Sequence, residues 1–177
     1  MTVSLQISKY IENSKLNGRI CRWNKQVIYV YITAISAPVA NKDFYYFQVK
    51  KGMENWNIAL KTCGINLRFD IANTPDYADV VVHWTKVGRV FEGMCKYPGI
   101  VNGEFKKISI DIGLKNEYSG KNTTDESIFF VIMHELGHAL GLGHGIDIND
   151  VMFVPHQKNI STPSPNDLYV LKYIYSN

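Results

Sequence analysis

The spacing of apolar and polar positions changes along the chain and predicts the order of the secondary-structure elements. A run of β-branched and aromatic residues at 27–32 predicts a buried strand. Over residues 44–63, apolar side chains recur three and four positions apart, which predicts an amphipathic helix that stops at Gly64. Asn102-Gly103 is typical of a hairpin turn. Apolar runs near turn residues predict four further strands, at 65–69, 79–84, 93–97 and 107–112.

Two more helices are predicted in the last third of the chain. Residues 123–126 have the pattern of a capping box and open a long helix whose apolar stripe runs to Leu140. A second capping box at 164–167 opens a final helix that runs through Tyr175. Only one helix lies among the five predicted strands, so the sheet should be mixed. The predicted fold class is α+β, with a mixed, twisted five-stranded sheet and two long helices.

The composition is that of an ordinary folded chain. Of the 177 residues, 46% are hydrophobic and 20% are charged, which excludes a disordered chain, a collagen and a long coiled coil. No apolar run approaches the roughly 20 residues that a transmembrane helix needs. The net charge of +3 is small and the lysines and arginines are scattered, so neither a nucleic-acid partner nor a membrane partner is expected.

The N-terminus and the cysteines bear on the cellular compartment. The first six residues do not combine a basic region with an apolar stretch, so no secretory signal peptide is expected. The three cysteines, Cys21, Cys63 and Cys95, are too few for a disulfide framework and are interpreted as reduced thiols. We expect a protein that resides in the cytoplasm or is exported by a signal-independent route.

Candidate chemistry is concentrated in the motif H-E-x-x-H-x-x-G-x-x-H, at residues 134–144. His134 and His138 are one helical turn apart and face the same side. Glycines after His138 let the chain turn sharply and bring His144 back as a third ligand. Three imidazoles with an open fourth position are typical of catalytic zinc, because structural zinc sites are closed by four protein ligands. The sequence predicts one zinc ion, with Glu135 beside it as a general base rather than a ligand.

The long motif, followed by Met152 eight residues after His144, resembles the metzincin zinc endopeptidases. In that family the methionine forms a tight turn beneath the zinc, the Met-turn. Other features are similar to the matrixin branch, the catalytic domain of matrix metalloproteinases and their minimal bacterial relatives: Arg22-Trp23, Trp56, Ala78-Asp79-Val80 and the helix that begins with Ser164-x-x-Asp167. The resemblance implies a metzincin (zincin-like) fold, with an active-site cleft above a small C-terminal subdomain that holds the Met-turn and the final helix.

The resemblance also implies a domain organisation. Residues 1–18 are expected to form an N-terminal extension, and residues 19–177 a single catalytic domain. Within that domain, the upper subdomain is expected to span 19–144 and the lower subdomain 145–177.

Several features of better-known metzincins are absent. The loop that binds a second, structural zinc in animal matrixins corresponds to residues 87–92, which contain no histidine. His83 is alone in an apolar strand and is interpreted as a strand residue, so one zinc and no calcium site are expected. Cys21 lacks a Pro-Arg-Cys-Gly context, so the protein is expected to be active as translated. Astacin-like and serralysin-like members carry a tyrosine two residues after the methionine, where this chain has Val154.

Two potential ligands outside the motif receive plainer interpretations. His156 is read as a loop histidine near the cleft, because three histidines already fill the protein's share of a catalytic zinc site. Cys95 is read as a small buried thiol. Residues 150–157 are expected to supply the wall of the specificity pocket.

The predicted function is a zinc-dependent endopeptidase that acts as a monomer on extended protein or peptide substrates. The family binds its substrate antiparallel to an edge strand, and the candidates here are Gly93, Met94, Cys95, Lys96 and Tyr97. One alternative is a non-catalytic, zinc-containing protein-binding module, although such a module need not retain Glu135. The other is a processing protease with a single dedicated substrate.

Overall fold

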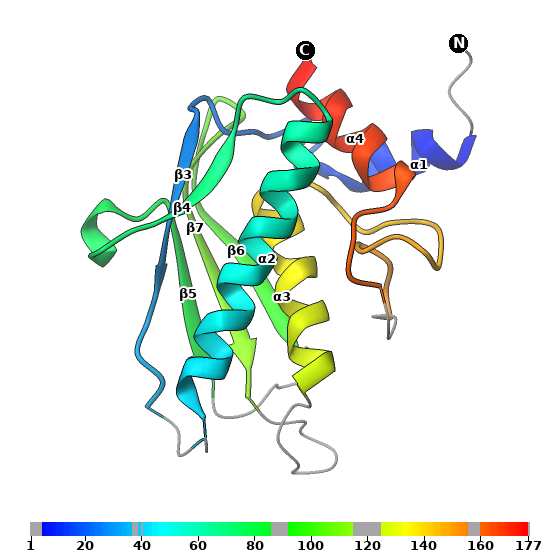
Figure 1. Ribbon diagram of the computed structural model, residues 1–177. Coiled ribbons are helices and arrows are strands. Elements are labelled where there is room, and N and C mark those ends of the chain that lie inside the picture. The colour runs from blue at the N-terminus through cyan, green and yellow to red at the C-terminus, as the bar shows by residue number, and fades with distance from the viewer. Residues whose placement is uncertain are drawn as a thin grey trace.

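Five strands form a sheet at the centre of the fold (Figure 1). The computed structural model describes residues 5–36, 39, 41–85, 92–114, 125–155 and 160–176. The strands of the sheet are β3 (Val27–Ile32), β4 (Arg68–Ile71), β5 (Val80–Thr85), β6 (Gly93–Val101) and β7 (Glu104–Gly113). Their order is β4-β3-β5-β7-β6; all neighbours are parallel except β6 and β7, which are antiparallel. The mixed five-stranded sheet is therefore confirmed, and β6 forms one of its edges.

Helices α2 (Lys42–Thr62) and α3 (Asp125–Ala139) lie side by side against the sheet (Figure 1). Trp56 of α2 is fully buried, and its indole N–H donates to the Met133 carbonyl of α3 at 2.9 Å. Gly52 lets the two helices approach closely, since a Cβ at this position would lie 2.9 Å from Ile132 Cγ2. This packing fixes the face of α3 that carries the motif.

The ends of α2 follow the chemistry expected from the sequence. The Asn41 side chain accepts a hydrogen bond from the Phe44 N–H at 3.1 Å, which caps the first turn. The helix is followed by Gly64 with a φ of +71°, a left-handed conformation that glycine adopts without steric cost. The capping box predicted at 123–126 lies outside the residues whose side chains the structure describes.

Several predicted strands have different bounds in the structure, and β7 already begins at Glu104 rather than at residue 107. β4 begins at Arg68 rather than at residue 65, because the Leu67 N–H bonds locally to the Ile65 carbonyl at 2.9 Å. β6 does not end at Tyr97; it passes through Pro98 with a register irregularity and continues to the hairpin turn. Proline is tolerated here because an edge strand does not need every N–H for pairing.

The N-terminal residues contain elements that the sequence analysis did not predict. They form α1 (Leu5–Asn13) and a small hairpin of β1 (Lys15–Leu16) and β2 (Arg19–Ile20). α1 lies beside the final helix, α4 (Pro165–Ser176) (Figure 1). Tyr10 and Ile11 of α1 are buried and belong to the main apolar core. A short 3-10 helix, η1 (Pro75–Tyr77), completes the described elements, and none of the described helices combines the length and apolar character that a membrane crossing requires.

Candidate metal centre

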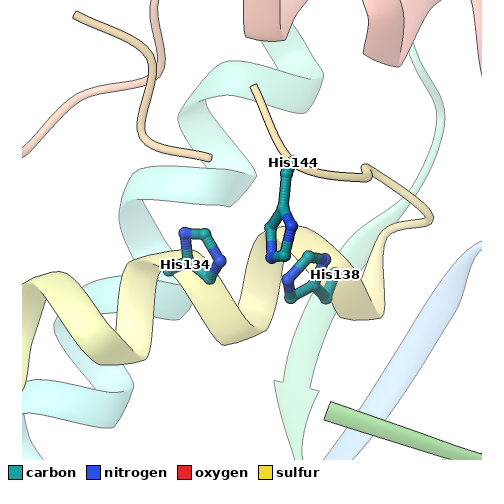
Figure 2. A group of neighbouring side chains, drawn as sticks. All are labelled: His134, His138 and His144. Atoms are coloured by element: carbon teal, nitrogen blue, oxygen red, sulfur yellow. The ribbon is translucent and has the colours of Figure 1, made fainter. Parts of the chain in front are cut away.

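Three histidine rings converge at the end of α3 (Figure 2). His134 and His138 project from one side of α3, and His144 returns towards them from the chain that follows the helix. One ring nitrogen of each residue lies within 4.8 Å of the corresponding atoms of the other two. Within the described ranges no other group of three histidine, cysteine or acidic side chains comes this close together. The structure thus gathers the three predicted ligands at one point.

Backbone carbonyls orient two of the rings. His134 Nδ1 lies 3.0 Å from the Val151 carbonyl, and His138 Nδ1 lies 2.7 Å from the Leu142 carbonyl. A carbonyl oxygen only accepts, so Nδ1 of each ring carries the proton. The lone pair of each neutral ring is then on Nε2. This is the arrangement that metal-binding histidines adopt, because the outer hydrogen bond fixes both the tautomer and the ring orientation.

The glycine at the end of α3 turns the chain back towards the helix. Gly141 has a φ of +96°, and its N–H bonds to the His138 carbonyl at 2.9 Å, while the Leu142 N–H bonds to the Gly137 carbonyl at 3.1 Å. These two bonds form a Schellman motif. A Cβ at residue 141 would also lie 2.6 Å from the Cys21 carbonyl oxygen. Glycine is required here by both conformation and space, and the turn it makes delivers His144 to the other two rings.

The Glu135 carboxyl group is buried on α3, the helix that carries two of the three rings. The residue is only 3% exposed, and Oε2 has no hydrogen-bond partner. Burial raises the pKa of this carboxyl group to about 8, although a hydrogen bond from the Cys95 backbone acts in the opposite direction. An unpartnered buried oxygen is costly, and it is typical of a position that receives a ligand. A cation among the rings would favour the ionised carboxylate.

Comparison with known families agrees with this geometry. The family model of the matrixins, a peptidase family, matches residues 22–176. The chain belongs to the matrixin family. Matrixins are zinc-dependent metallopeptidases, which act on peptide or protein substrates, and the α+β architecture with a five-stranded mixed sheet is theirs. None of the curated proteins compared with the chain matches it.

The residues present suit the metal that matrixins use. Three imidazole nitrogens form the donor set of a catalytic zinc site and leave a position for water or substrate. The unpartnered Glu135 oxygen lies on the helix that carries two of the rings.

Met152 lies in the loop that follows the H-E-x-x-H-x-x-G-x-x-H motif. Its side chain is completely buried, and its carbonyl accepts a hydrogen bond from the Gly145 N–H at 2.7 Å. A Cβ at Gly137, on α3, would collide with Met152 Sδ and would lie 2.9 Å from a ring carbon of Trp56. The thioether therefore packs directly on the helix between the two histidines, and its role as a Met-turn stays a prediction.

Replacement of Gly137 by alanine should lower the free energy of unfolding by about 1–3 kcal/mol, because the added methyl group overpacks this contact. At an open helical position the same change would normally stabilise the helix. Urea unfolding of Gly137→Ala, Met152→Ala and the double variant measures the coupling. The double variant should be more stable than the two losses together imply; simple additivity would show that the two residues do not press on each other.

Two buried aspartates, which the sequence analysis did not expect to support the metal ligands, hold the loop at residues 145–151 in place. Asp150 Oδ2 accepts hydrogen bonds from the Ile146 and Asp147 N–H groups at 3.0 and 2.8 Å. Asp167 Oδ2 accepts from the Val151 N–H at 2.9 Å and from the Ser164 N–H at 2.8 Å. The second of these bonds confirms the capping box predicted at 164–167. Asp167 thereby fixes the residue whose carbonyl orients His134.

The predicted substrate strand lies close to the centre. Gly93 of β6 packs on Glu135, since a Cβ there would lie 2.6 Å from Oε1. Tyr97 donates its hydroxyl hydrogen to the His138 carbonyl at 3.3 Å. Cys95 is partly buried, and burial raises the pKa of its thiol, which therefore stays protonated. β6 thus contacts the helix of the motif through alternate residues, Gly93, Cys95 and Tyr97.

The other residues considered in the sequence analysis do not belong to the three-histidine cluster or are outside the described residues. His83 lies in β5 with an exposed side chain. Cys21 is buried, and its thiol is 3.8 Å from the Arg19 carbonyl. His156 and the 87–91 part of the loop compared with the second zinc site of animal matrixins lie outside the described residues, as do positions 156 and 157 of the expected pocket wall.

Proposed function

We propose that this matrixin is a zinc-dependent endopeptidase that cleaves extended protein or peptide substrates. His134, His138 and His144 act as the zinc ligands and Glu135 as the general base. The observation that carries the proposal is the convergence of three ring nitrogens within 4.8 Å of one another, two of them from a helix that also holds a buried carboxylate oxygen without a partner. The fold by itself requires neither the cluster of three ring nitrogens nor the unpartnered carboxylate oxygen.

Zinc held by three imidazoles supplies a Lewis acid that acidifies water and polarises a carbonyl group. Glu135 accepts the proton that water loses during attack on the scissile carbonyl, and it returns this proton to the departing amine. Burial of this carboxyl group, which is only 3% exposed, raises its pKa and makes the carboxylate a stronger base than an exposed glutamate. Val154, exposed in the following loop, offers no phenol, so the site relies on the metal and on backbone donors for the developing negative charge.

Substrate binding is assigned to the edge of the sheet. β6 pairs with β7 and is the last strand of the sheet order, which leaves its other side available for an added strand. An extended peptide paired antiparallel to Gly93–Tyr97 would pass Glu135, because Gly93 contacts that carboxyl group. Lys96 is exposed on this strand and forms an ion pair with Asp111.

The lower part of the domain supports the metal ligands. We assign residues 19–177 to one catalytic domain, with an upper part to residue 144 and a lower part from 145 that contains the Met-turn and α4. Two residues of the lower part support the ligands in this assignment. Met152 packs on α3 at Gly137, and Asp167 holds Val151, whose carbonyl orients His134. The protein is expected to act as a monomer.

Cleavage of unfolded casein by the purified, zinc-loaded protein tests the proposal. Hydrolysis should be lost in the presence of a chelator and should return when zinc is added back, because the proposed mechanism uses zinc as its Lewis acid. Metal analysis should give one zinc per chain.

Zinc binding without cleavage of casein or of a diverse peptide library would favour the non-catalytic binding module. Cleavage confined to one bond of one partner would favour the dedicated processing protease. Activity unaffected by chelation would contradict both the metal site and the proposed function.

A further inference from the structure

The last turn of α1 lies against the loop that carries His144. Asn13 Nδ2 donates to the His144 carbonyl at 2.9 Å, although the two residues are 131 positions apart. Ser14 Oγ accepts a hydrogen bond from the Gly143 N–H at 2.9 Å, and this hydroxyl also donates to the Tyr10 carbonyl at 2.9 Å. Ser14 is only 2% exposed. Two consecutive residues of the histidine loop are therefore tied to the N-terminal helix through their backbones.

A second set of contacts leads from α1 to His134. The Tyr10 hydroxyl donates to Asp167 Oδ1 at 2.6 Å, and both residues are completely buried. Asp167 Oδ2 accepts from the Val151 N–H at 2.9 Å, and the Val151 carbonyl accepts from His134 Nδ1 at 3.0 Å. The same short helix thus contacts one histidine backbone directly and reaches a second ring through two intervening residues.

The close approach of the two segments depends on a glycine. A Cβ at Gly143 would collide with the Asn13 carbonyl group and would lie 2.6 Å from the Ser14 N–H nitrogen. No larger residue fits between α1 and the loop without displacing one of them. The absence of a side chain therefore allows the two hydrogen bonds to the loop backbone to form.

The loop is irregular, so the contacts with α1 add to the hydrogen bonds that Leu142 and Gly145 make with Gly137 and Met152. Residues 142–145 are in neither helix nor strand, and they include Gly143 and Gly145. Glycine-containing irregular chain loses much conformational entropy when it is ordered. A metal ligand must be held within about 0.5 Å of its productive position. Without outside contacts, ordering His144 would oppose metal binding.

We propose that Tyr10, Asn13 and Ser14 are positioning residues for the metal site, and that they raise its zinc affinity by holding the His144 loop in the binding geometry. This inference rests on the zinc site proposed above and extends it to side chains far from the motif in sequence. None of the three is a ligand or touches the substrate. They act through the backbone of residues 143 and 144 and through Asp167.

The test compares the full chain with an Asn13→Asp/Ser14→Ala double variant. Asn13 is exposed, so the isosteric aspartate removes the donor to His144 without emptying the core. Ser8→Ala, at an exposed position of the same helix, is the matched control. Zinc dissociation constants are measured by competition with a chromophoric chelator, and the cobalt-substituted proteins are compared by visible absorption.

The double variant should bind zinc about 10–100-fold more weakly, which is the usual effect of losing outer contacts to a metal ligand. Its cobalt absorption should change in intensity, and each tenfold loss should reduce the zinc-induced gain in unfolding free energy by about 1.4 kcal/mol. Ser8→Ala should match the unaltered chain. If the double variant does not fold, Tyr10→Phe removes only the hydroxyl that bonds Asp167 and should weaken zinc binding in the same direction.

An unchanged zinc affinity with a lower stability of the metal-free protein would overturn the inference, since α1 would then support only the fold. The proposed function would survive that result, because it requires only that the unaltered chain bind one zinc and hydrolyse peptides. Failure of the unaltered chain to bind zinc would overturn both.

Discussion

Glu135→Ala should lower the rate of peptide hydrolysis by about 10²–10⁴-fold while the protein keeps its fold and its zinc. The expected loss is that of a general base, which transfers a proton but does not coordinate the metal. Glu135 does not belong to the cluster of three ring nitrogens, and its carboxyl group is buried on the same helix as two of them, with one oxygen unpartnered. Turnover with a peptide substrate and zinc content of the same preparation are the two measurements.

Glu135→Gln separates chemistry from packing. The amide fills nearly the same space but cannot accept a proton from water, so its activity should fall as far as that of the alanine variant. Glu54→Gln, at an exposed position of α2, makes the same chemical change away from the site and should leave activity unchanged. Near-normal turnover of either Glu135 variant, in a zinc-loaded preparation free of other proteases, would contradict the assigned role.

His144→Ala should remove most of the zinc and, with it, the activity. The two histidines of α3 alone provide a bidentate site, and a catalytic zinc site needs three protein ligands. The alanine variant retains the His144 backbone carbonyl to which Asn13 donates, so the loop keeps its hydrogen bond and only the ligand is lost. Zinc per chain after dialysis, determined by metal analysis, measures the effect.

His83→Ala is the control for this experiment, because His83 is an exposed histidine of β5 outside the three-ring cluster. The His83→Ala variant, like the unaltered protein, should bind one zinc per chain. Undiminished zinc in His144→Ala, or two zinc ions in the unaltered protein, would contradict the single three-histidine site.

The histidine cluster could be predicted because local geometry determines most of it. Spacing of four residues places His134 and His138 on one side of α3, and glycine at 141 forms the helix-ending turn that brings His144 back. The same holds for α2, because the capping residue Asn41 and the glycine that follows the helix, Gly64, can both be recognised in the sequence. Helical spacing, helix caps and glycine turns each depend on residues that are close together in the sequence, so they can be predicted from it.

The N-terminal helix could not be predicted with the same ease. α1 has nine residues, too few to be stable alone, and polar and apolar residues alternate over its first four positions. Its apolar positions Ile7, Tyr10 and Ile11 do follow a helical spacing, and this was the available signal. Asn17-Gly18 is likewise a hairpin signal of the same kind as Asn102-Gly103. No local pattern shows which distant residues these side chains contact. Asn13 bonds to His144, and Tyr10 bonds to Asp167, only in the folded chain.

The bond between Tyr10 and Asp167 joins residues 157 positions apart, and this has a consequence for biosynthesis. The ribosome releases α1 long before α4 exists, so α1 has no docking partner until residues 165–176 have been synthesised. A nascent chain that has just passed His144 already contains the whole H-E-x-x-H-x-x-G-x-x-H motif, yet it lacks Asp167 and the support that α1 gives through it. The histidine site therefore cannot reach the arrangement described here until Asp167 and the rest of α4 have been synthesised.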